Sequence, residues 1–213
     1  MQVVYLHGFA SSASSTKASY FATKLREHGV PLQTPDLNQP NFSTLTVSRM
    51  VEQVTELIDG LPSAAPVILI GSSLGGLVAV HVARTRPDRV RRVILLAPAL
   101  EFGGDPTRSL GDRNLDQWRD TGLTNIFHYG YGRVIPVGYA LYADACGYDC
   151  ADVTLTVPIQ IFQGRRDTVV DPASVERWAS TRPTVELHMV DDDHQLGGSL
   201  DYIWTQSARF LGL

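Results

Sequence analysis

The chain has 213 residues, the length of one ordinary domain, and 44% of them are hydrophobic, which is enough to form a core. Lys and Arg number 18 against 22 Asp and Glu, and the resulting net charge of −4 leaves no basic excess for binding nucleic acid. The composition also excludes a disordered chain, and two cysteines exclude a disulfide scaffold. We therefore expect a single domain over residues 1–213 and no nucleic-acid partner.

The first residues carry no targeting signal. Met1 is followed directly by a strand-like run, without a basic region or a small-residue cleavage site. No apolar run approaches the roughly 18 residues that a membrane-spanning helix needs. We expect a cytoplasmic protein without a membrane span.

Short apolar runs alternate with stretches of helical periodicity, which is typical of a parallel sheet flanked by helices. Most of the runs are nearly continuous, which indicates strands covered on both faces. The expected strands are 3–7, 31–35, 67–71, 93–97, 159–162 and 185–190. The expected helices are 16–28, 45–59, 74–86, 172–180 and 200–210, the second with an apolar stripe of Val47, Val51, Val54 and Ile58.

Residues 101–152, called the insertion below, interrupt this alternation. They contain no clean strand pattern and eight aromatic residues, among them Trp118 and Tyr142. One interpretation is a lid over the carboxyl ends of the strands, where α/β sheets bind ligands, with Trp118 and Tyr142 contacting the substrate. The alternative is an irregular excursion whose aromatic side chains form only a small core of their own.

A Gly-x-Ser-x-Gly motif spans Gly71 to Gly75, between an apolar run and a predicted helix. In this strand–turn–helix context the motif is typical of a nucleophile elbow, in which a sharp turn holds the Ser73 hydroxyl above the sheet. Small residues are needed on either side because larger side chains would collide. The alternative is a glycine-rich loop without chemistry or one that binds phosphate, but the Lys-Ser/Thr pair of a P-loop is missing.

A nucleophilic serine needs a base, and the base needs an acid that orients it. Asp167 follows the fifth predicted strand and His194 follows the sixth, so both are expected at the sheet edge that holds Ser73. Asp171 is a rival for the acid, although its place before Pro172 favours a helix cap. The acidic run 191–193 is interpreted as a solvated loop.

Two backbone N–H groups are candidates for an oxyanion hole. Leu74 directly follows the serine, and Phe9 lies in the His7-Gly8-Phe9 segment after the first predicted strand. Gly8 allows a tight turn there. His7 is expected to brace this loop by hydrogen bonding.

Taken together, His7–Phe9, Gly71–Gly75, Asp167 and His194 resemble the α/β-hydrolase superfamily. The stretch Tyr5 to Ser12, with Lys17-Ala18 and Gly71–Gly76, resembles the small YqiA-like esterases, and related mitochondrial depalmitoylating and acyl-glucuronide esterases share similar stretches. This resemblance implies an α/β-hydrolase fold of about six mostly parallel strands. It also implies a carboxylic-ester or thioester hydrolase that needs no metal and no cofactor.

The expected function is hydrolysis of short to medium acyl esters by acyl transfer through Ser73, His194 and Asp167. A small-molecule ester is the expected partner, and the C-x3-C pair of Cys146 and Cys150 has no second pair with which to bind zinc. Dehalogenases and epoxide hydrolases are disfavoured because their nucleophile is Asp. The alternatives that stay open are an acyl thioesterase, a C–C hydrolase, and a receptor that keeps the pocket without catalysis.

Overall fold

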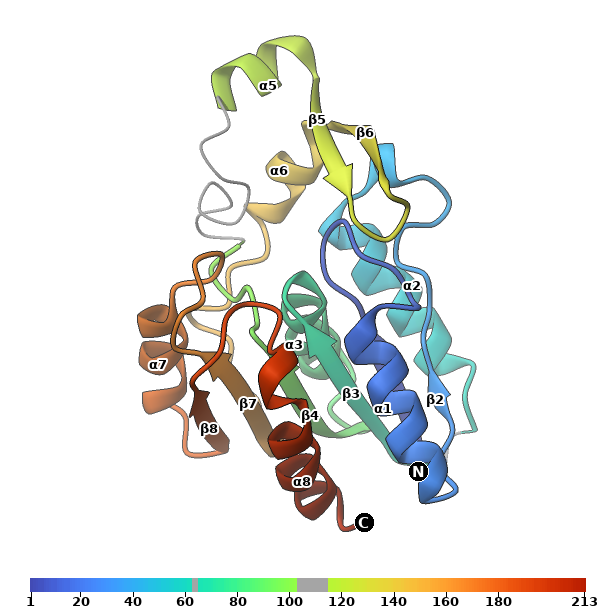
Figure 1. The fold of residues 1–213 in the computed structure, drawn as a ribbon. Helices are drawn as coiled ribbons and strands as arrows, with labels where there is room; N and C mark the ends of the chain where they lie inside the picture. The colour runs from blue at the N-terminus through green and yellow to red at the C-terminus, as the bar shows by residue number, and fades with distance from the viewer. Residues whose placement is uncertain (63–64, 103–114) are drawn as a thin grey trace.

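Six short apolar runs form one parallel sheet with helices on both faces, and the insertion adds a separate two-stranded sheet (Figure 1). The computed structural model describes residues 1–62, 65–102 and 115–213. The described elements in chain order are β1 (Gln2–Leu6), α1 (Thr16–Glu27), β2 (Leu32–Gln33), η1 (Phe42–Thr44), α2 (Val47–Asp59), β3 (Val67–Ser72), α3 (Leu74–Thr85), β4 (Val90–Leu96), α5 (Leu115–Thr121), β5 (Leu123–His128), β6 (Arg133–Gly138), α6 (Ala140–Ala145), β7 (Ile159–Gly164), α7 (Pro172–Ser180), β8 (Val185–Val190), η2 (Gly197–Ser199) and α8 (Leu200–Leu211).

The strands of the large sheet lie in the order β2-β1-β3-β4-β7-β8, and all neighbouring pairs are parallel. The chain runs from β1 outward to β2 and then returns past β1 to β3, so the order reverses between β1 and β3. Open α/β sheets bind ligands beyond the carboxyl ends of the strands at such a reversal. The loop after β1 and the turn after β3 meet at this point.

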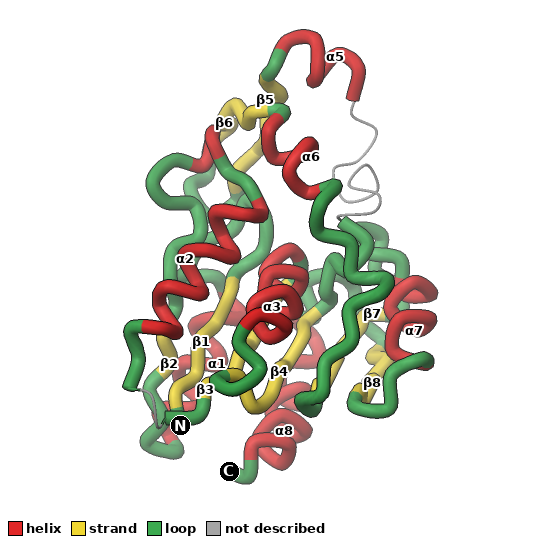
Figure 2. The backbone as a smooth tube through the Cα atoms, turned by 180° about the vertical axis from the view of Figure 1, so that it is seen from behind, coloured by secondary structure: helices red, strands yellow, loops and turns green. Residues whose placement is uncertain are grey.

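Alternate side chains of each strand enter two different cores. On β1, Val4 and Leu6 belong to the cluster shared with α2, α3 and α7, whereas Val3 and Tyr5 belong to the cluster shared with α1 and α8. Figure 1 shows α1 and α8 in front of the sheet, and Figure 2 shows α2, α3 and α7 from behind. The near-continuous apolar runs therefore arise because both faces of the sheet are covered.

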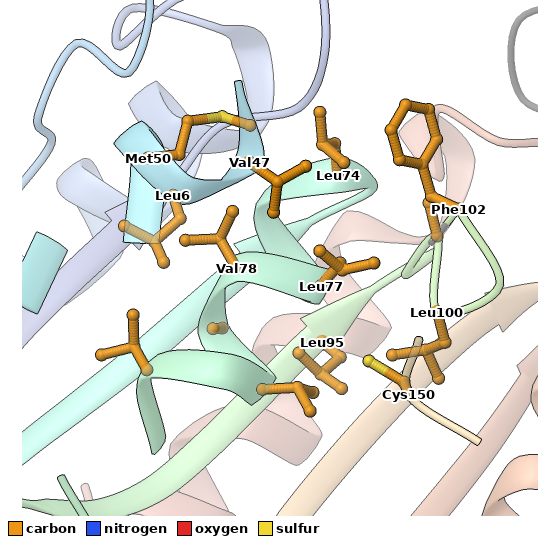
Figure 3. Close-up of a cluster of buried hydrophobic side chains, with 14 of the residues drawn as sticks. Leu6, Val47, Met50, Leu74, Leu77, Val78, Leu95, Leu100, Phe102 and Cys150 are labelled. Atoms are coloured by element: carbon orange, nitrogen blue, oxygen red, sulfur yellow. The ribbon is translucent and has the colours of Figure 1, made fainter. Parts of the chain in front are cut away.

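Helix α2 packs its apolar stripe against α3. Figure 3 shows Leu77 and Val78 of α3 facing the side of α2 that carries Val47 and Met50. The predicted stripe contained Val51, but the structure buries Met50 in its place and leaves Val51 partly buried. Each fully buried side chain of this kind contributes about 1.5–3 kcal/mol, so this stripe holds α2 against α3. The buried stripe is Val47, Met50, Val54 and Ile58.

The predicted sheet of about six parallel strands is confirmed, and each predicted strand and helix overlaps an observed one. The main difference is in β4, which begins at Val90 rather than at residue 93. The apolar run is interrupted there by Arg91, which is exposed, and by Arg92, whose guanidinium lies 5.7 Å from the centre of the Phe210 ring. Within the described residues, none of the helices has both the length and the apolar character needed to cross a membrane.

The expectation of no clean strand in the insertion was wrong, because β5 and β6 form an antiparallel hairpin. Pro136 lies inside β6, which argues against a strand in a sequence but is tolerated here because both strands of a two-stranded sheet are edges. Leu123, Phe127 and Val134 are exposed on this hairpin, so its sequence does not alternate between apolar and polar residues. Residues 103–114 of the predicted insertion lie outside the described residues.

The described part of the insertion lies beyond the carboxyl ends of the large sheet (Figure 1). It is attached to the start of α2 through Asp144 of α6, which accepts hydrogen bonds from the backbone N–H of Ser48 at 2.8 Å and from the Ser48 hydroxyl. The Tyr148 hydroxyl donates to the same Ser48 oxygen at 2.8 Å. A carboxylate at the amino end of α2 also interacts favourably with the helix dipole. Asp144 thus caps a helix of the sheet domain from within the insertion.

We expect Asp144→Ala to lower the free energy of unfolding by about 1–2 kcal/mol, because it removes a capping carboxylate from α2. Urea denaturation followed by circular dichroism measures this loss. Asp120→Ala is the matched control, because the Asp120 side chain is 73% exposed and lies 3.5 Å from Arg119, whose side chain is also exposed. Equal stability of the two variants would mean that α6 does not hold α2.

Candidate active site

Ser73 occupies the sharp turn between β3 and α3. Its backbone angles are φ 52° and ψ −120°, a conformation that residues other than glycine rarely adopt. Three backbone hydrogen bonds hold it there: the Ser73 N–H donates to Leu96 at 2.9 Å, and its carbonyl accepts from Gly76 at 2.8 Å and from Ala99 at 3.1 Å. The turn leaves the hydroxyl at the amino end of α3, where the helix dipole favours negative charge.

Two glycines allow the chain to pack closely around this serine. A Cβ on Gly75 would lie 2.2 Å from the carbonyl oxygen of Leu6, at the end of β1. A Cβ on Gly71 would lie 2.5 Å from the carbonyl oxygen of Gly75. No side chain fits in either place, so the Gly-x-Ser-x-Gly spacing is required by backbone contacts as well as by the turn.

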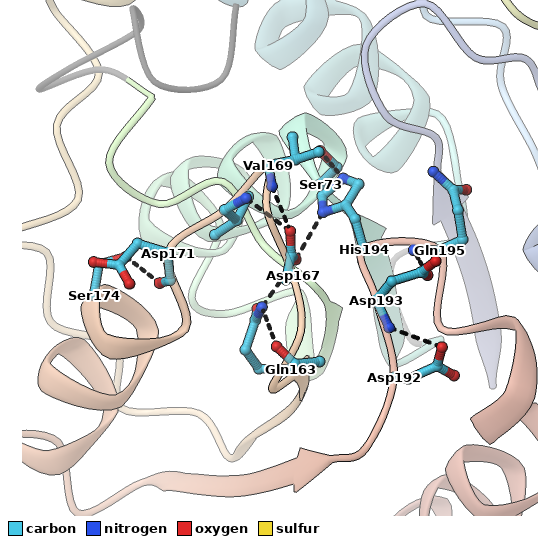
Figure 4. Close-up of polar contacts among 12 residues, drawn as sticks. Ser73, Gln163, Asp167, Val169, Asp171, Ser174, Asp192, Asp193, His194 and Gln195 are labelled. Carbon is cyan, nitrogen blue, oxygen red and sulfur yellow. Dashed lines mark hydrogen bonds and ion pairs between the residues drawn. The ribbon is translucent and has the colours of Figure 1, made fainter. Parts of the chain in front are cut away.

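The structure brings Ser73, His194 and Asp167 into one hydrogen-bonded chain (Figure 4). His194 Nε2 lies 3.1 Å from Ser73 Oγ, and His194 Nδ1 lies 2.8 Å from Asp167 Oδ2. The side chain of Asp167 is fully buried and that of His194 is 13% exposed. The three residues come from the exits of β3, β7 and β8, which lie on the same edge of the sheet.

Asp167 is held as a carboxylate. Its Oδ1 accepts the backbone N–H groups of Val169 at 2.8 Å and Val170 at 2.9 Å, and its Oδ2 accepts the Gln163 amide at 2.9 Å. Burial alone would raise the pKa of Asp167, but these bonds and the adjacent His194 lower it below its ordinary value. An ionised Asp167 requires the His194 proton on Nδ1, which leaves Nε2 free to accept the Ser73 hydroxyl proton.

The other carboxylates of these loops have different partners. Asp171 caps α7 by accepting the Ala173 N–H at 3.1 Å, as predicted. Asp191 forms an ion pair with Arg166 at 3.0 Å. Asp192 Oδ1 accepts the Asp193 N–H at 2.8 Å, and Asp193 Oδ1 accepts the Gln195 N–H at 2.8 Å (Figure 4). Of the five carboxylates considered, Asp167 is the one bonded to the His194 ring.

The loop after β1 lies directly against the serine. A Cβ on Gly8 would be 3.1 Å from Ser73 Cβ and 3.7 Å from its hydroxyl oxygen. Leu74 is the first residue of α3, so its N–H has no partner within the helix. Within the described residues, the N–H of Phe9 also has no hydrogen-bond acceptor. The Gly8–Phe9 segment and the start of α3 therefore lie beside Ser73, and the N–H groups of Phe9 and Leu74 remain the candidate oxyanion donors.

His7 braces this loop, as expected from the sequence. Its Nε2 accepts the Leu37 N–H at 3.0 Å, so the proton is on Nδ1, which donates to the Gly8 carbonyl at 2.9 Å. Burial lowers the pKa of His7, although the Gly8 carbonyl and Asp36 oppose the change. A neutral His7 that bonds on both sides fixes the path of the chain into Gly8 and Phe9.

Two buried polar residues at the site had no role assigned from the sequence. Gln163, at the end of β7, is fully buried and donates to Asp167. The Lys17 ammonium donates to the carbonyls of His194 at 3.3 Å and Gln195 at 3.1 Å. Lys17 lies 177 positions from His194 in the chain, so no local pattern links them. The only signal in the sequence was a lysine within the motif that carries the family resemblance.

The two aromatic residues predicted to bind substrate differ in how exposed their side chains are. Trp118 is only 1% exposed, and its indole N–H donates to the Val137 carbonyl at 2.9 Å. Its ring packs edge-on against Tyr139 at 5.8 Å, inside the insertion, and offers no free surface to a substrate. Tyr142 is half-buried and stacks on Tyr139 with ring centres 5.5 Å apart. Of the two, Tyr142 alone has accessible surface.

Residues 2–211 match the Uncharacterised protein family (UPF0227), and the chain belongs to that family. The expected membership of the α/β-hydrolase superfamily, with its small YqiA-like proteins, is thereby confirmed. Two solved structures share the fold across most of their length. The alpha/beta hydrolase domain-containing protein 10 from mouse has a TM-score of 0.82 and 19% identity, covering 99% of this chain and 89% of that one. Est1E from Butyrivibrio proteoclasticus, with ferulic acid bound, has a TM-score of 0.83 and 17% identity, covering 99% and 87%.

Curated relatives match over shorter stretches. Lipase LipV of Mycobacterium tuberculosis (strain ATCC 25618 / H37Rv) is 34% identical over 90 residues, which cover 40% of this chain and 34% of that protein. The mitochondrial palmitoyl-protein thioesterase ABHD10 of Mus musculus is 26% identical over 136 residues, covering 61% of this chain and 44% of that protein. The matches thus span less than half the length of these two relatives.

The buried Lys17 makes stability depend on pH in a defined direction. Burial lowers the pKa of Lys17 from 10.5 to about 8, although Asp167, Asp193 and Asp192 oppose the change. Between these two values the unfolded chain binds a proton that the folded chain does not, so stability rises with pH. We expect the free energy of unfolding of the wild type to rise relative to Lys17→Met between pH 8 and pH 10, by up to about 1.4 kcal/mol per pH unit.

Urea denaturation of both proteins at several pH values in this window measures the difference. Subtracting the variant removes the contributions of Cys150 and Tyr5, whose pKa values burial raises to about 12 in both proteins. A difference that stays constant with pH would mean that the ammonium is hydrated.

Proposed function

We propose that this member of UPF0227 is a serine carboxylic-ester hydrolase that works by acyl transfer. The observation that carries the proposal is the hydrogen-bonded chain from Ser73 through His194 to Asp167, next to two free N–H groups. Nucleophile, base and orienting acid in this arrangement, with an oxyanion site, are the parts that ester hydrolysis requires.

In the first half of the reaction the Ser73 oxygen attacks the ester carbonyl while His194 Nε2 takes the hydroxyl proton. The carbonyl oxygen becomes an oxyanion between the N–H groups of Phe9 and Leu74, and the amino end of α3 adds a favourable dipole. Asp167 stabilises the protonated ring and keeps its Nδ1 proton in place. His194 then gives its proton to the leaving alcohol, and an acyl-serine remains.

In the second half water attacks the acyl-serine, and His194 Nε2 accepts a proton from that water. The same two N–H groups bind the second oxyanion. Collapse of this intermediate returns the proton to Ser73 Oγ and releases the acid. All charge that develops is met by backbone donors and by the His194–Asp167 pair.

The insertion is proposed as a lid over this site, because its described part lies beyond the carboxyl ends of the strands. Tyr142 is the proposed substrate contact within it. Trp118 is proposed to act indirectly, by supporting Tyr139 and Tyr142 through the aromatic packing. Small-molecule esters with short to medium acyl chains are the proposed substrates.

A thioesterase is the second candidate, and one observation favours it. The mitochondrial palmitoyl-protein thioesterase of Mus musculus is 26% identical over a stretch that covers 61% of this chain. The same serine, histidine and aspartate can act on a thioester carbonyl, so a distinction between the two activities depends on the acyl and leaving groups that the site accepts. The third alternative is a receptor that binds a ligand without turning it over.

Asp167→Asn is expected to lower turnover of a reactive ester by about two to four orders of magnitude, because the amide favours the wrong His194 tautomer. Asp191→Asn is the matched control from the neighbouring loop, with an expected loss below about tenfold. Steady-state hydrolysis of nitrophenyl acetate measures both, after circular dichroism has shown intact folding. Loss of activity in Asp171→Asn instead of Asp167→Asn would contradict the acid assignment.

A fluorophosphonate probe separates an enzyme from a receptor. We expect rapid labelling of the wild type at Ser73 and none of Ser73→Ala, with the labelled residue identified by peptide mass spectrometry. A wild type that binds ligands but reacts neither with the probe nor with any ester would be a receptor.

Chain-length preference tests the substrate class. A series of nitrophenyl esters from acetate to palmitate, run beside acyl-CoA thioesters, is expected to give the highest kcat/KM at short to medium length. Tyr142→Ala is expected to change this preference more than it changes turnover of the acetate, since Tyr142 has accessible surface within the proposed lid. Highest efficiency on palmitoyl thioesters would favour the thioesterase instead.

A further inference from the structure

Lys17 occupies a position that is unfavourable for a lysine. It is in the first turn of α1, where the positive end of the helix dipole repels a cation. The residue is only 9% exposed, so the ammonium has lost most of its hydration. Among the described residues, no carboxylate lies within ion-pair distance of it. A buried lysine without a close counter-charge indicates that its contacts serve another purpose.

These contacts are the backbone carbonyls of His194 and Gln195, at 3.3 and 3.1 Å. Both carbonyls belong to the loop between β8 and η2 that carries the proposed catalytic base. Within the loop, the Asp193 carbonyl accepts the Leu196 N–H at 3.2 Å and the Asp193 carboxylate accepts the Gln195 N–H. The peptide groups after His194 are therefore fixed by bonds within the loop and by Lys17 from α1.

The backbone next to His194 needs such support. Leu196 has φ 57°, a left-handed conformation that costs a leucine energy, and it is fully buried in the core beneath α1 and α8. A turn in this conformation persists only where its surroundings hold it. Helix α1 is itself fixed, because the Tyr20 hydroxyl donates to Asp201 at the start of α8 at 2.5 Å.

Electrostatics alone does not explain Lys17. The charged groups that face it are Asp167, which follows β7, and Asp192 and Asp193, which belong to the loop between β8 and η2. A cation among them opposes protonation of the His194 ring, which the proposed reaction requires. The useful property of Lys17 is thus its set of N–H donors, which reach two carbonyls that face α1.

We propose that Lys17 is a positioning residue that holds the His194 loop against α1, so that the ring meets Ser73 and Asp167 together. The proposal rests on the serine-hydrolase function above, and it adds a residue from the opposite end of the chain to the site. Lys17 touches neither the ring nor the nucleophile, and it acts through the backbone of His194.

Lys17→Met tests this, because Met keeps the length and the apolar stem but has no N–H donor. Lys24→Met is the matched control: Lys24 is on the same helix, pairs with Glu27 at 3.5 Å and has a side chain 30% exposed. We expect kcat for a nitrophenyl ester to fall at least tenfold in Lys17→Met, with KM changed less than twofold, and neither constant to change in Lys24→Met. Lys17→Gln, which keeps an amide donor, is expected to retain more activity than Lys17→Met.

A second measurement reads the His194 ring directly and does not need turnover. The Nδ1 proton between His194 and Asp167 gives a far-downfield proton signal in NMR, assigned by its loss in Asp167→Asn. We expect this signal to broaden or disappear in Lys17→Met at pH 7, because the ring leaves its hydrogen bond part of the time. Lys24→Met is expected to keep the wild-type signal.

The outcomes separate this inference from the proposed function. A wild type that hydrolyses no ester would refute the function, while the NMR comparison would still decide the role of Lys17. A folded Lys17→Met with wild-type kcat and an unchanged Nδ1 signal would overturn the inference, even if it unfolds more easily. If Lys17→Met does not fold, the same two measurements on Lys17→Leu, which also lacks a donor, decide, and wild-type values in that variant would also overturn it.

Discussion

The close approach of β1 to the turn after β3 is the constraint on which the site depends. The carbonyl of Leu6 lies where a side chain on residue 75 would be, so the two segments touch backbone to backbone. This contact places Gly8 against Ser73 at the start of α3, where the N–H groups of Phe9 and Leu74 are the proposed oxyanion donors. The strained backbone of Ser73 and the two glycines around it are therefore parts of one packing arrangement. A larger residue at position 75 would push β1 and the loop after it away from the turn that holds Ser73.

The part of the site around Asp167 depends on hydrogen bonding, because a buried charged group needs donors that replace water. Asp167 has four hydrogen-bond donors, two from backbone and one each from Gln163 and His194, so its charge stays stable although its side chain is inaccessible. Such a carboxylate keeps the imidazole in one tautomer without needing solvent. The surrounding acids are turned away by local bonds to Arg166 and to backbone N–H groups. All five acids carry the same charge, so it is the position of Asp167 that makes it the one bonded to the His194 ring.

The sequence was sufficient to predict the fold and the three central residues, because both follow from short-range patterns. Apolar runs mark the strands, and parallel strands end on the same edge, so residues just after β3, β7 and β8 had to converge. Lys17 could not be assigned a role in this way, since its partners are carbonyl groups that any residue can provide. The β5–β6 hairpin was missed because it contains Pro136 and because its exposed apolar residues remove the alternation that marks a strand. The prediction that Trp118 contacts substrate rests on aromatic content, which alone does not distinguish a binding surface from an interior.

The two faces of the sheet supply different parts of the site. The face with α2 and α3 carries Ser73 at the start of α3, and the insertion is attached to it through Asp144 and Ser48. The face with α1 and α8 reaches the site through Lys17, which holds the loop of His194. Ser73 and His194 are thus supported from opposite faces of the sheet, and their side chains meet beyond the carboxyl ends of the strands. A change in the packing of α1 against α8 would act first on the loop of His194, and the 3.1 Å contact between His194 and Ser73 is where it would reach the proposed nucleophile.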